Sequence, residues 1–225
     1  MDKIHKPSKF GLPPKRGLYD PQFEKDSCGV GLVANIKGIP SREIMEDAFH
    51  INSRMDHRGG CGFEENTGDG AGILMAIPDN FFRLEAKKLN FNLPDQGNYA
   101  VGNIFLPQNK KERAFCIKVI EKTVIDQDLE LIGWREVPTD HKKADVGPAA
   151  LDAQPFISQL FIGNKKGISQ EDFERQVYLI RKKFTHKLRS DTSLEEGSLM
   201  YACSLSSTVM TYKGMLTAAQ LFPFY

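Results

Sequence analysis

Two segments of this sequence hold residue types that could do chemistry: SCGVG at 27–31, and the glycine-rich stretch DHRGGCGFEENTGDGAG at 56–72. A cysteine is a good nucleophile as its thiolate, which a nearby imidazole, a helix N-terminus or a cation stabilises. Cys28 precedes an apolar run with strand character, so no helix dipole acts on it. Cleavage of the Ser27–Cys28 bond would supply another device, because a free α-amine with a pKa of about 7.7–8.0 can accept the thiol proton. The alternative is that Cys28 is a small residue of the core.

The glycine-rich stretch supports three interpretations. Its TGDGAG part, residues 67–72, could let backbone N–H groups approach a phosphate, but it lacks the Gly-Lys-Ser/Thr ending of a P-loop and runs into a predicted strand. The glycines could instead serve a turn with positive φ, or bring backbone close to another reactive group. Asp69 is then either a turn former or a residue that orients a site. His57 and Arg58, at the entrance, are either solvated or part of that site.

Composition argues against several classes of function. The four cysteines lie far apart with no C-x-x-C pair, so we expect no metal site and, in a reducing compartment, no disulfide. Thirty basic and 29 acidic residues give a net charge of +1, which predicts no nucleic-acid or anionic-membrane partner. No apolar run approaches the roughly 20 residues of a membrane span, and no signal-peptide core precedes Cys28. We therefore expect a cytoplasmic protein.

Helices and strands in alternation are predicted to position these residues. Residues 1–27 contain four prolines and are expected to be an extended, poorly ordered leader. Apolar, β-branched runs predict strands at 28–38, 73–78, 97–107, 130–138 and 155–163, and two short strands around a Ser-Ser turn within 198–216. Apolar spacings of three and four predict helices at 41–54, 79–89, 109–129 and 169–189. Strand pairs separated by helices indicate an α+β domain.

The predicted helices have recognisable caps and apolar faces. Ser41 and Ser169 stand at helix starts, where a hydroxyl can accept a hydrogen bond from a free backbone N–H. For helix 169–189 the predicted buried face is Phe173, Val177, Ile180, Phe184 and Leu188. For helix 109–129 it is Ala114, Phe115, Ile117, Ile120 and Val124.

Five blocks of the sequence resemble the N-terminal amidotransferase domain of glutamate synthase large subunits. They are GLYDPQFEKDSCGVGLVA, MDHRGGCGFEENTGDGAGILMAIPDNFF, GWREVP, QPFISQLFI and YACSLSSTVMTYKGML, and they follow the family order from residue 17 onward. The resemblance implies the N-terminal-nucleophile fold, an αββα sandwich of two antiparallel sheets between helical layers.

The resemblance also implies roles for individual residues. Cys28 is the expected class II nucleophile, and residues 1–27 are a propeptide whose removal exposes it. Arg58 is expected to position the Cys28 end, and Gly59 to line the glutamine pocket. Supporting roles behind these groups are expected for Thr67, Gly68, Asp69 and Gly70, with Asp69 orienting Arg58.

The implied reaction removes the side-chain amide nitrogen of glutamine through a thioester on Cys28, giving glutamate and ammonia. In a complete glutamate synthase, a synthase domain or subunit receives the ammonia and aminates 2-oxoglutarate. That enzyme uses FMN, an iron–sulfur cluster and an electron donor, NADPH, NADH or ferredoxin. We expect no cofactor within these 225 residues, since they have neither a cysteine cluster nor a Gly-x-Gly-x-x-Gly before a helix.

The sequence departs from the family pattern in two ways. Gly60 stands where the family usually has alanine, and Phe63 and Glu64 stand where alanine and aspartate are common. The family segments that bind the substrate carboxylate, form the oxyanion hole and bind the substrate amine have no counterpart up to Tyr225. We therefore expect residues 28–225 to be the N-terminal part of a larger domain, with the sandwich incomplete in this chain.

Two other functions stay open at this point. One is a non-catalytic interaction or regulatory module on the same fold, because the oxyanion and carboxylate groups are missing. The other is an N-terminal-nucleophile hydrolase that acts on a different amide.

Overall fold

The computed structural model describes residues 14–23, 28–196 and 199–225, which form helices and antiparallel strands. The α-helices are α1 (Arg42–Arg54), α2 (Asp79–Lys88), α3 (Lys110–Asp126), α4 (Pro148–Asp152), α5 (Gln170–Arg189) and α6 (Ala218–Phe224). The strands are β1 (Ala71–Ala76), β2 (Tyr99–Leu106), β3 (Glu130–Glu136), β4 (Phe156–Gly163), β5 (Tyr201–Ala202) and β6 (Val209–Gly214). Two 3₁₀ turns, η1 (Pro21–Phe23) and η2 (Asp56–Arg58), complete the order.

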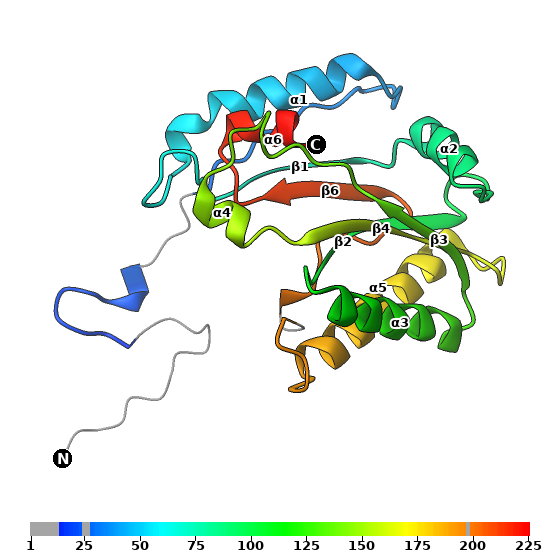
Figure 1. Cartoon of the computed structure of the whole chain (residues 1–225). Coiled ribbons are helices and arrows are strands. Elements are labelled where there is room, and N and C mark those ends of the chain that lie inside the picture. The colour runs from blue at the N-terminus through cyan, green and yellow to red at the C-terminus, as the bar shows by residue number, and fades with distance from the viewer. Residues whose placement is uncertain (1–13, 24–27, 197–198) are drawn as a thin grey trace.

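The strands form two antiparallel sheets. One has the strand order β3-β4-β2-β5, and the other is the pair β1-β6. In Figure 1, α1 lies beyond the β1-β6 pair with α6 beside it, and α3 and α5 lie beyond the four-stranded sheet. This order of helix, sheet, sheet and helix confirms the predicted α+β class and is the layering of the predicted αββα sandwich.

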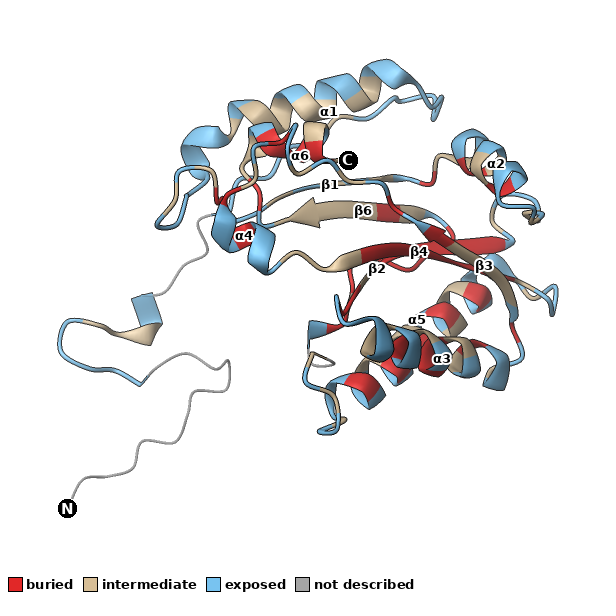
Figure 2. Cartoon of the chain, viewed as in Figure 1, coloured by how far each residue is buried: buried red, intermediate tan, exposed pale blue. Residues whose placement is uncertain are grey.

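The largest part of the core lies between the four-stranded sheet and the helices α3 and α5, where Figure 2 colours much of the ribbon red for buried residues. Ser169 caps α5 as predicted, accepting a hydrogen bond from the Asp172 backbone N–H. The predicted face of α5 is confirmed, because all five of its residues are fully buried.

The prediction for α3 was partly wrong. The buried face is Cys116, Val119, Ile120 and Val124, while Phe115 is 41% exposed. Positions 116, 120 and 124 repeat every four residues and lie on one side of the helix. Each residue turns by about 100°, so position 115 points away from that side.

The predicted strand at 28–38 was also wrong. The segment has no strand partner in the described part of the chain and runs alongside α1 (Figure 1). A Cβ on Gly31 would lie 2.1 Å from Cγ2 of Ile51, so the glycine lets the backbone approach the helix. Val30, Leu32 and Ile36 face outward, with exposures of 90%, 88% and 103%. The residues have strand propensity, but a strand forms only where a neighbouring backbone can pair with it.

Helix α1 is the least buried of the long helices. Ser41 caps it as predicted by accepting a hydrogen bond from the Ile44 N–H, yet none of its residues is buried (Figure 2). Its role in the fold is to carry the chain to η2, where Arg58 lies. The Arg58 N–H donates to the Met55 carbonyl at 2.7 Å, and this bond fixes the turn.

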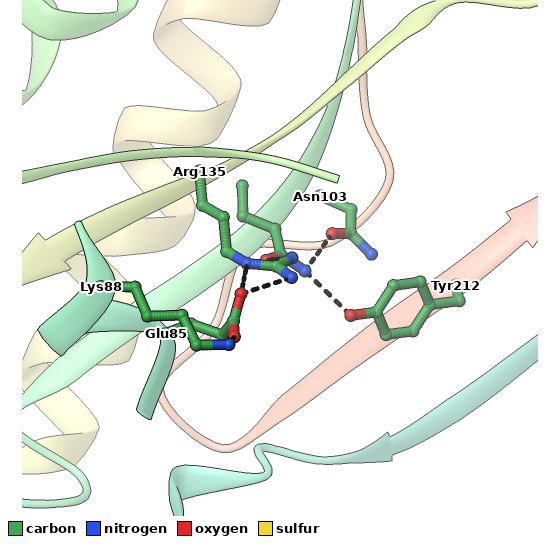
Figure 3. Close-up of polar contacts among 6 residues, drawn as sticks. Glu85, Lys88, Asn103, Arg135 and Tyr212 are labelled. Carbon is green, nitrogen blue, oxygen red and sulfur yellow. Dashed lines mark hydrogen bonds and ion pairs between the residues drawn. The ribbon is translucent and has the colours of Figure 1, made fainter. Parts of the chain in front are cut away.

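A buried network of polar side chains joins the two sheets (Figure 3). Arg135 on β3 donates to Gln159 on β4 at 3.0 Å and to Glu85 on α2 at 2.8 Å. The Gln159 amide donates to Asn103 on β2 at 3.0 Å and to the Tyr212 hydroxyl on β6 at 2.9 Å. Because buried polar groups must be paired, this network holds β6 at one position over the four-stranded sheet.

Part of the sequence prediction lies outside the described residues. Of the predicted leader, only 14–23 is described, and it contains η1 and an isolated bridge between Arg16 and Tyr19. The start of the predicted 198–216 strand pair is also outside. Its two strands are present as β5 and β6, each in a different sheet. No helix in the described ranges is long and apolar enough to cross a membrane.

Candidate active site

A cleft of about 870 Å³ opens where residues 28–29, η2, the glycine-rich stretch and the end of β6 meet. From the first half of the chain, its lining includes Cys28, Arg58, Gly59, Gly60, Asp69 and Gly70. From the second half, its lining includes Tyr201, Thr211, Lys213, Leu216, Thr217 and Ala218. The structure therefore brings the cysteine and the glycine-rich stretch, the two chemistry-bearing segments, to one cleft.

Cys28 is exposed in this cleft, and its backbone is tied to η2. An Arg58 guanidinium nitrogen lies 3.5 Å from the Cys28 carbonyl oxygen, within hydrogen-bonding range. A Cβ on Gly29 would lie 3.1 Å from Met55 Sδ and 3.3 Å from Arg58 Cβ. The glycine after the cysteine thus lets the chain pass close to the end of α1, which places Cys28 beside Arg58.

Residues 59–70 form a small hairpin, which we call the glycine hairpin. The Asp69 N–H donates to the Gly60 carbonyl at 2.9 Å, and the Gly62 N–H donates to the Thr67 carbonyl at 2.9 Å. The hairpin leads directly into strand β1. Phosphate binding of the P-loop kind requires a helix N-terminus after the glycine-rich loop, and none follows TGDGAG.

The ends of the glycine hairpin have different surroundings. Its base, with Gly59, Gly60, Asp69 and Gly70, lines the cleft. Its tip, residues 64–67, is not part of the cleft lining, and Thr67 is 7% exposed. Thr67 and Gly68 are buried and are not among the cleft-lining residues, and their supporting roles stay a prediction.

Asp69 contacts Gly60 across the base of the hairpin. A Cβ on Gly60 would lie 2.2 Å from Asp69 Oδ2, so glycine leaves the space that the carboxylate fills. The hydrogen bond that the structure gives the Arg58 guanidinium goes to Cys28. The expected pairing of Asp69 with Arg58 stays a prediction.

The other three cysteines have different environments. Burial raises the pKa of the Cys116 and Cys203 thiols to about 11, which keeps both protonated and weakly nucleophilic near neutral pH. Cys61 is exposed on the glycine hairpin but is not among the cleft-lining residues. Of the four, Cys28 is the one that is both exposed and in the cleft.

The second half of the cleft wall could not be predicted from the sequence. Lys213 donates a hydrogen bond to the Tyr201 hydroxyl at 3.0 Å and lies 4.5 Å from the centre of that ring. Leu216 and Thr217 follow β6 and reach the cleft before α6 begins. The motif YKGML belongs to a predicted strand and to a block that resembles the family, but nothing in it predicts that residues 213–217 lie near residue 60.

The residues that the structure describes contain no group of three His, Cys, Asp or Glu side chains that could hold a metal ion. An iron–sulfur cluster takes four cysteine thiolates as a rule. With Cys116 and Cys203 buried in the core and Cys28 and Cys61 at the surface, the cysteines do not fit such a cluster.

Comparison with known proteins places these features in a family. Residues 28–225 match the family described as glutamine amidotransferases class-II, and the match begins at Cys28. The chain is 40% identical over 215 residues to the glutamate synthase [NADPH] large chain of Bacillus subtilis, covering 95% of this chain and 14% of that protein. It is 39% identical over 234 residues to the glutamate synthase [NADH] of Saccharomyces cerevisiae, covering 99% of this chain and 10% of that protein.

A plant relative extends the comparison. Identity is 37% over 232 residues to ferredoxin-dependent glutamate synthase 1, chloroplastic/mitochondrial, of Arabidopsis thaliana, covering 100% of this chain and 14% of that protein. The chain thus spans about a tenth to a seventh of the length of these relatives. The family match over nearly the whole chain confirms the resemblance: this chain belongs to the class II glutamine amidotransferases.

Proposed function

We propose that residues 28–225 are the N-terminal part of the glutamine-hydrolysing domain of a glutamate synthase. The observation that carries the proposal is Cys28, which is exposed in the cleft and is also the first residue of the family match. The relatives that cover nearly all of this chain are glutamate synthases. The proposed setting is the cytoplasm.

The proposed nucleophile requires removal of residues 1–27, which frees the α-amine of Cys28. That amine, with a pKa of about 7.7–8.0, takes the thiol proton as sulfur attacks the side-chain amide carbon of glutamine. The amine then gives the proton to the departing nitrogen. Ammonia is released, and the glutamyl group stays bound to the Cys28 sulfur as a γ-glutamyl thioester. Water attacks the thioester, which releases glutamate and returns the proton to sulfur.

The residues around Cys28 are assigned positioning roles in this reaction. Arg58 holds the cysteine backbone through the carbonyl contact at 3.5 Å. Gly59 lines the glutamine pocket, since it lies in the cleft next to Arg58. Asp69 and Gly70 support the base of the glycine hairpin, and Thr67 and Gly68 support it from behind.

The rest of the reaction belongs to the larger protein. We propose that groups outside this chain bind the substrate carboxylate and amine and form the oxyanion hole. A synthase domain or subunit would receive the ammonia and transfer it to 2-oxoglutarate. FMN and an iron–sulfur cluster would be held there, since the cysteines of this chain do not fit a cluster.

The first test is the N-terminus of the intact mature protein purified from its source. Intact mass and Edman sequencing are expected to find Cys28 first. Cys28→Ala is expected to lower glutamine hydrolysis by at least about a thousandfold, as loss of a covalent nucleophile does. Active protein that retains residues 1–27 would refute the mechanism. Turnover of another amide with glutamine untouched would refute the substrate.

A further inference from the structure

Gln220, the third residue of α6, is a buried side chain that joins three segments of the chain. It is 6% exposed. Its Nε2 donates to the Asn66 carbonyl and to the Asp145 carbonyl, both at 2.8 Å. Its Oε1 accepts from the Thr217 backbone N–H at 2.8 Å. Both amide hydrogens and the carbonyl oxygen are therefore paired, which leaves the side chain one orientation.

The Asn66 carbonyl belongs to the tip of the glycine hairpin, and the tip has further anchors. The Gly147 N–H donates to the same carbonyl at 2.9 Å. Glu64 Oε2 accepts from the Thr67 hydroxyl at 2.6 Å and from the Ala149 N–H at 3.1 Å. The tip is thus held by α6 from one direction and by the start of α4 from another.

The hairpin also touches the cleft wall directly. A Cβ on Gly68 would lie 2.3 Å from the Leu216 carbonyl carbon and 2.3 Å from the Thr217 nitrogen. Backbone therefore packs on backbone at this point, with no flexible side chain between them. Leu216 and Thr217 line the cleft, and Thr217 is the residue whose N–H Gln220 binds.

We propose that Gln220 is a positioning residue for glutamine hydrolysis, acting through the glycine hairpin. By locking the tip against α6, it sets where the hairpin base and Arg58 lie relative to Cys28. The two arms of the hairpin are joined by backbone hydrogen bonds, so a displaced tip displaces the base. Gln220 itself is outside the cleft lining. The inference rests on the proposed function.

Gln220→Glu in the intact mature protein tests this. The variant keeps the shape and the acceptor for Thr217 but turns an oxygen toward the Asn66 and Asp145 carbonyls. We expect labelling of Cys28 by the glutamine mimic 6-diazo-5-oxo-L-norleucine to slow about tenfold to a hundredfold, the effect of misplacement by about an ångström. Labelling by iodoacetamide, which makes no use of the pocket, is expected to change less than twofold, and the KM for glutamine to rise.

Gln108→Glu is the matched control, since Gln108 is exposed and donates to one backbone carbonyl, that of Gln154, at 3.0 Å. It is expected to leave both labelling rates unchanged. An equal loss of both reactions in Gln220→Glu, or a loss in neither, overturns the inference. If that variant does not fold, Glu64→Ala is used in its place. We expect it to slow labelling by the glutamine mimic several-fold and to leave labelling by iodoacetamide unchanged. Wild-type protein that the mimic fails to label at Cys28 overturns the proposed function as well.

Discussion

Gly60 and Gly68 lie on opposite arms of the glycine hairpin, and a methyl group meets different neighbours at each. At Gly60 it would meet the carboxylate of exposed Asp69, which can rotate away. We expect Gly60→Ala to change the free energy of unfolding by less than about 0.5 kcal/mol, while the KM for glutamine shifts several-fold because Asp69 moves in the cleft.

Gly68→Ala is the matched comparison for Gly60→Ala. Its methyl group would meet the backbone of Leu216 and Thr217, which cannot rotate away. We expect a loss of about 1–3 kcal/mol in the free energy of unfolding, as overpacking causes. Thermal melting of both variants of the intact protein measures the difference. Equal stability of the two would contradict the backbone contact.

An ion pair connects helix α2 to β3. In it, Glu85 Oε2 lies 2.8 Å from Arg135 Nη2. Hydrogen bonds from Lys88 and from Arg135 hold the pKa of Glu85 below its usual value of 4.5. A lowered pKa stabilises the folded state above that value, and the effect disappears as the pH falls through the lower pKa of the folded protein. We expect Glu85→Gln to cost about 1–3 kcal/mol at pH 7, with a smaller difference from wild type below pH 4.5.

Lys88→Gln, also in α2, is the control for Glu85→Gln. The Lys88 side chain is 72% exposed, whereas that of Arg135 is 10% exposed. Solvent screens the exposed pair, so this substitution is expected to cost less than about 0.5 kcal/mol at pH 7. Unfolding curves at several pH values measure both variants. A Lys88 variant as unstable as Glu85→Gln would show that the buried arginine is not the main partner.

Gln159 connects the two sheets of the molecule through Arg135, Asn103 and Tyr212 (Figure 3). Gln159→Met removes these bonds and leaves buried polar groups unpaired. This is expected to lower the free energy of unfolding by roughly 3 kcal/mol. We expect amide hydrogens of β6 to exchange about a hundredfold faster, and those of α5 to be accelerated less. Tyr212→Phe removes one bond and is expected to give a smaller increase. If amide exchange became equally faster in both sheets and in α5, the proposal that Gln159 specifically connects the two sheets would be contradicted.

The family, the α+β class and the helices with local signals could be predicted from the amino-acid sequence alone. The cap at Ser169 and the five-residue face of α5 depend on spacings within one helix, so periodicity predicts them. Cys28 was predicted as the nucleophile because motifs in family order surround it.

Tertiary structure decided which of these residues share a cleft and what holds them there. The Gln220 contact with Asn66 spans 154 positions and the Gln159 contact with Tyr212 spans 53, and neither leaves a periodic trace in the sequence. The segment 28–38 has the composition of a strand, yet in this structure it lies on α1 without a strand partner. Propensity is a property of the residue, whereas pairing needs a neighbour that only the folded chain brings close.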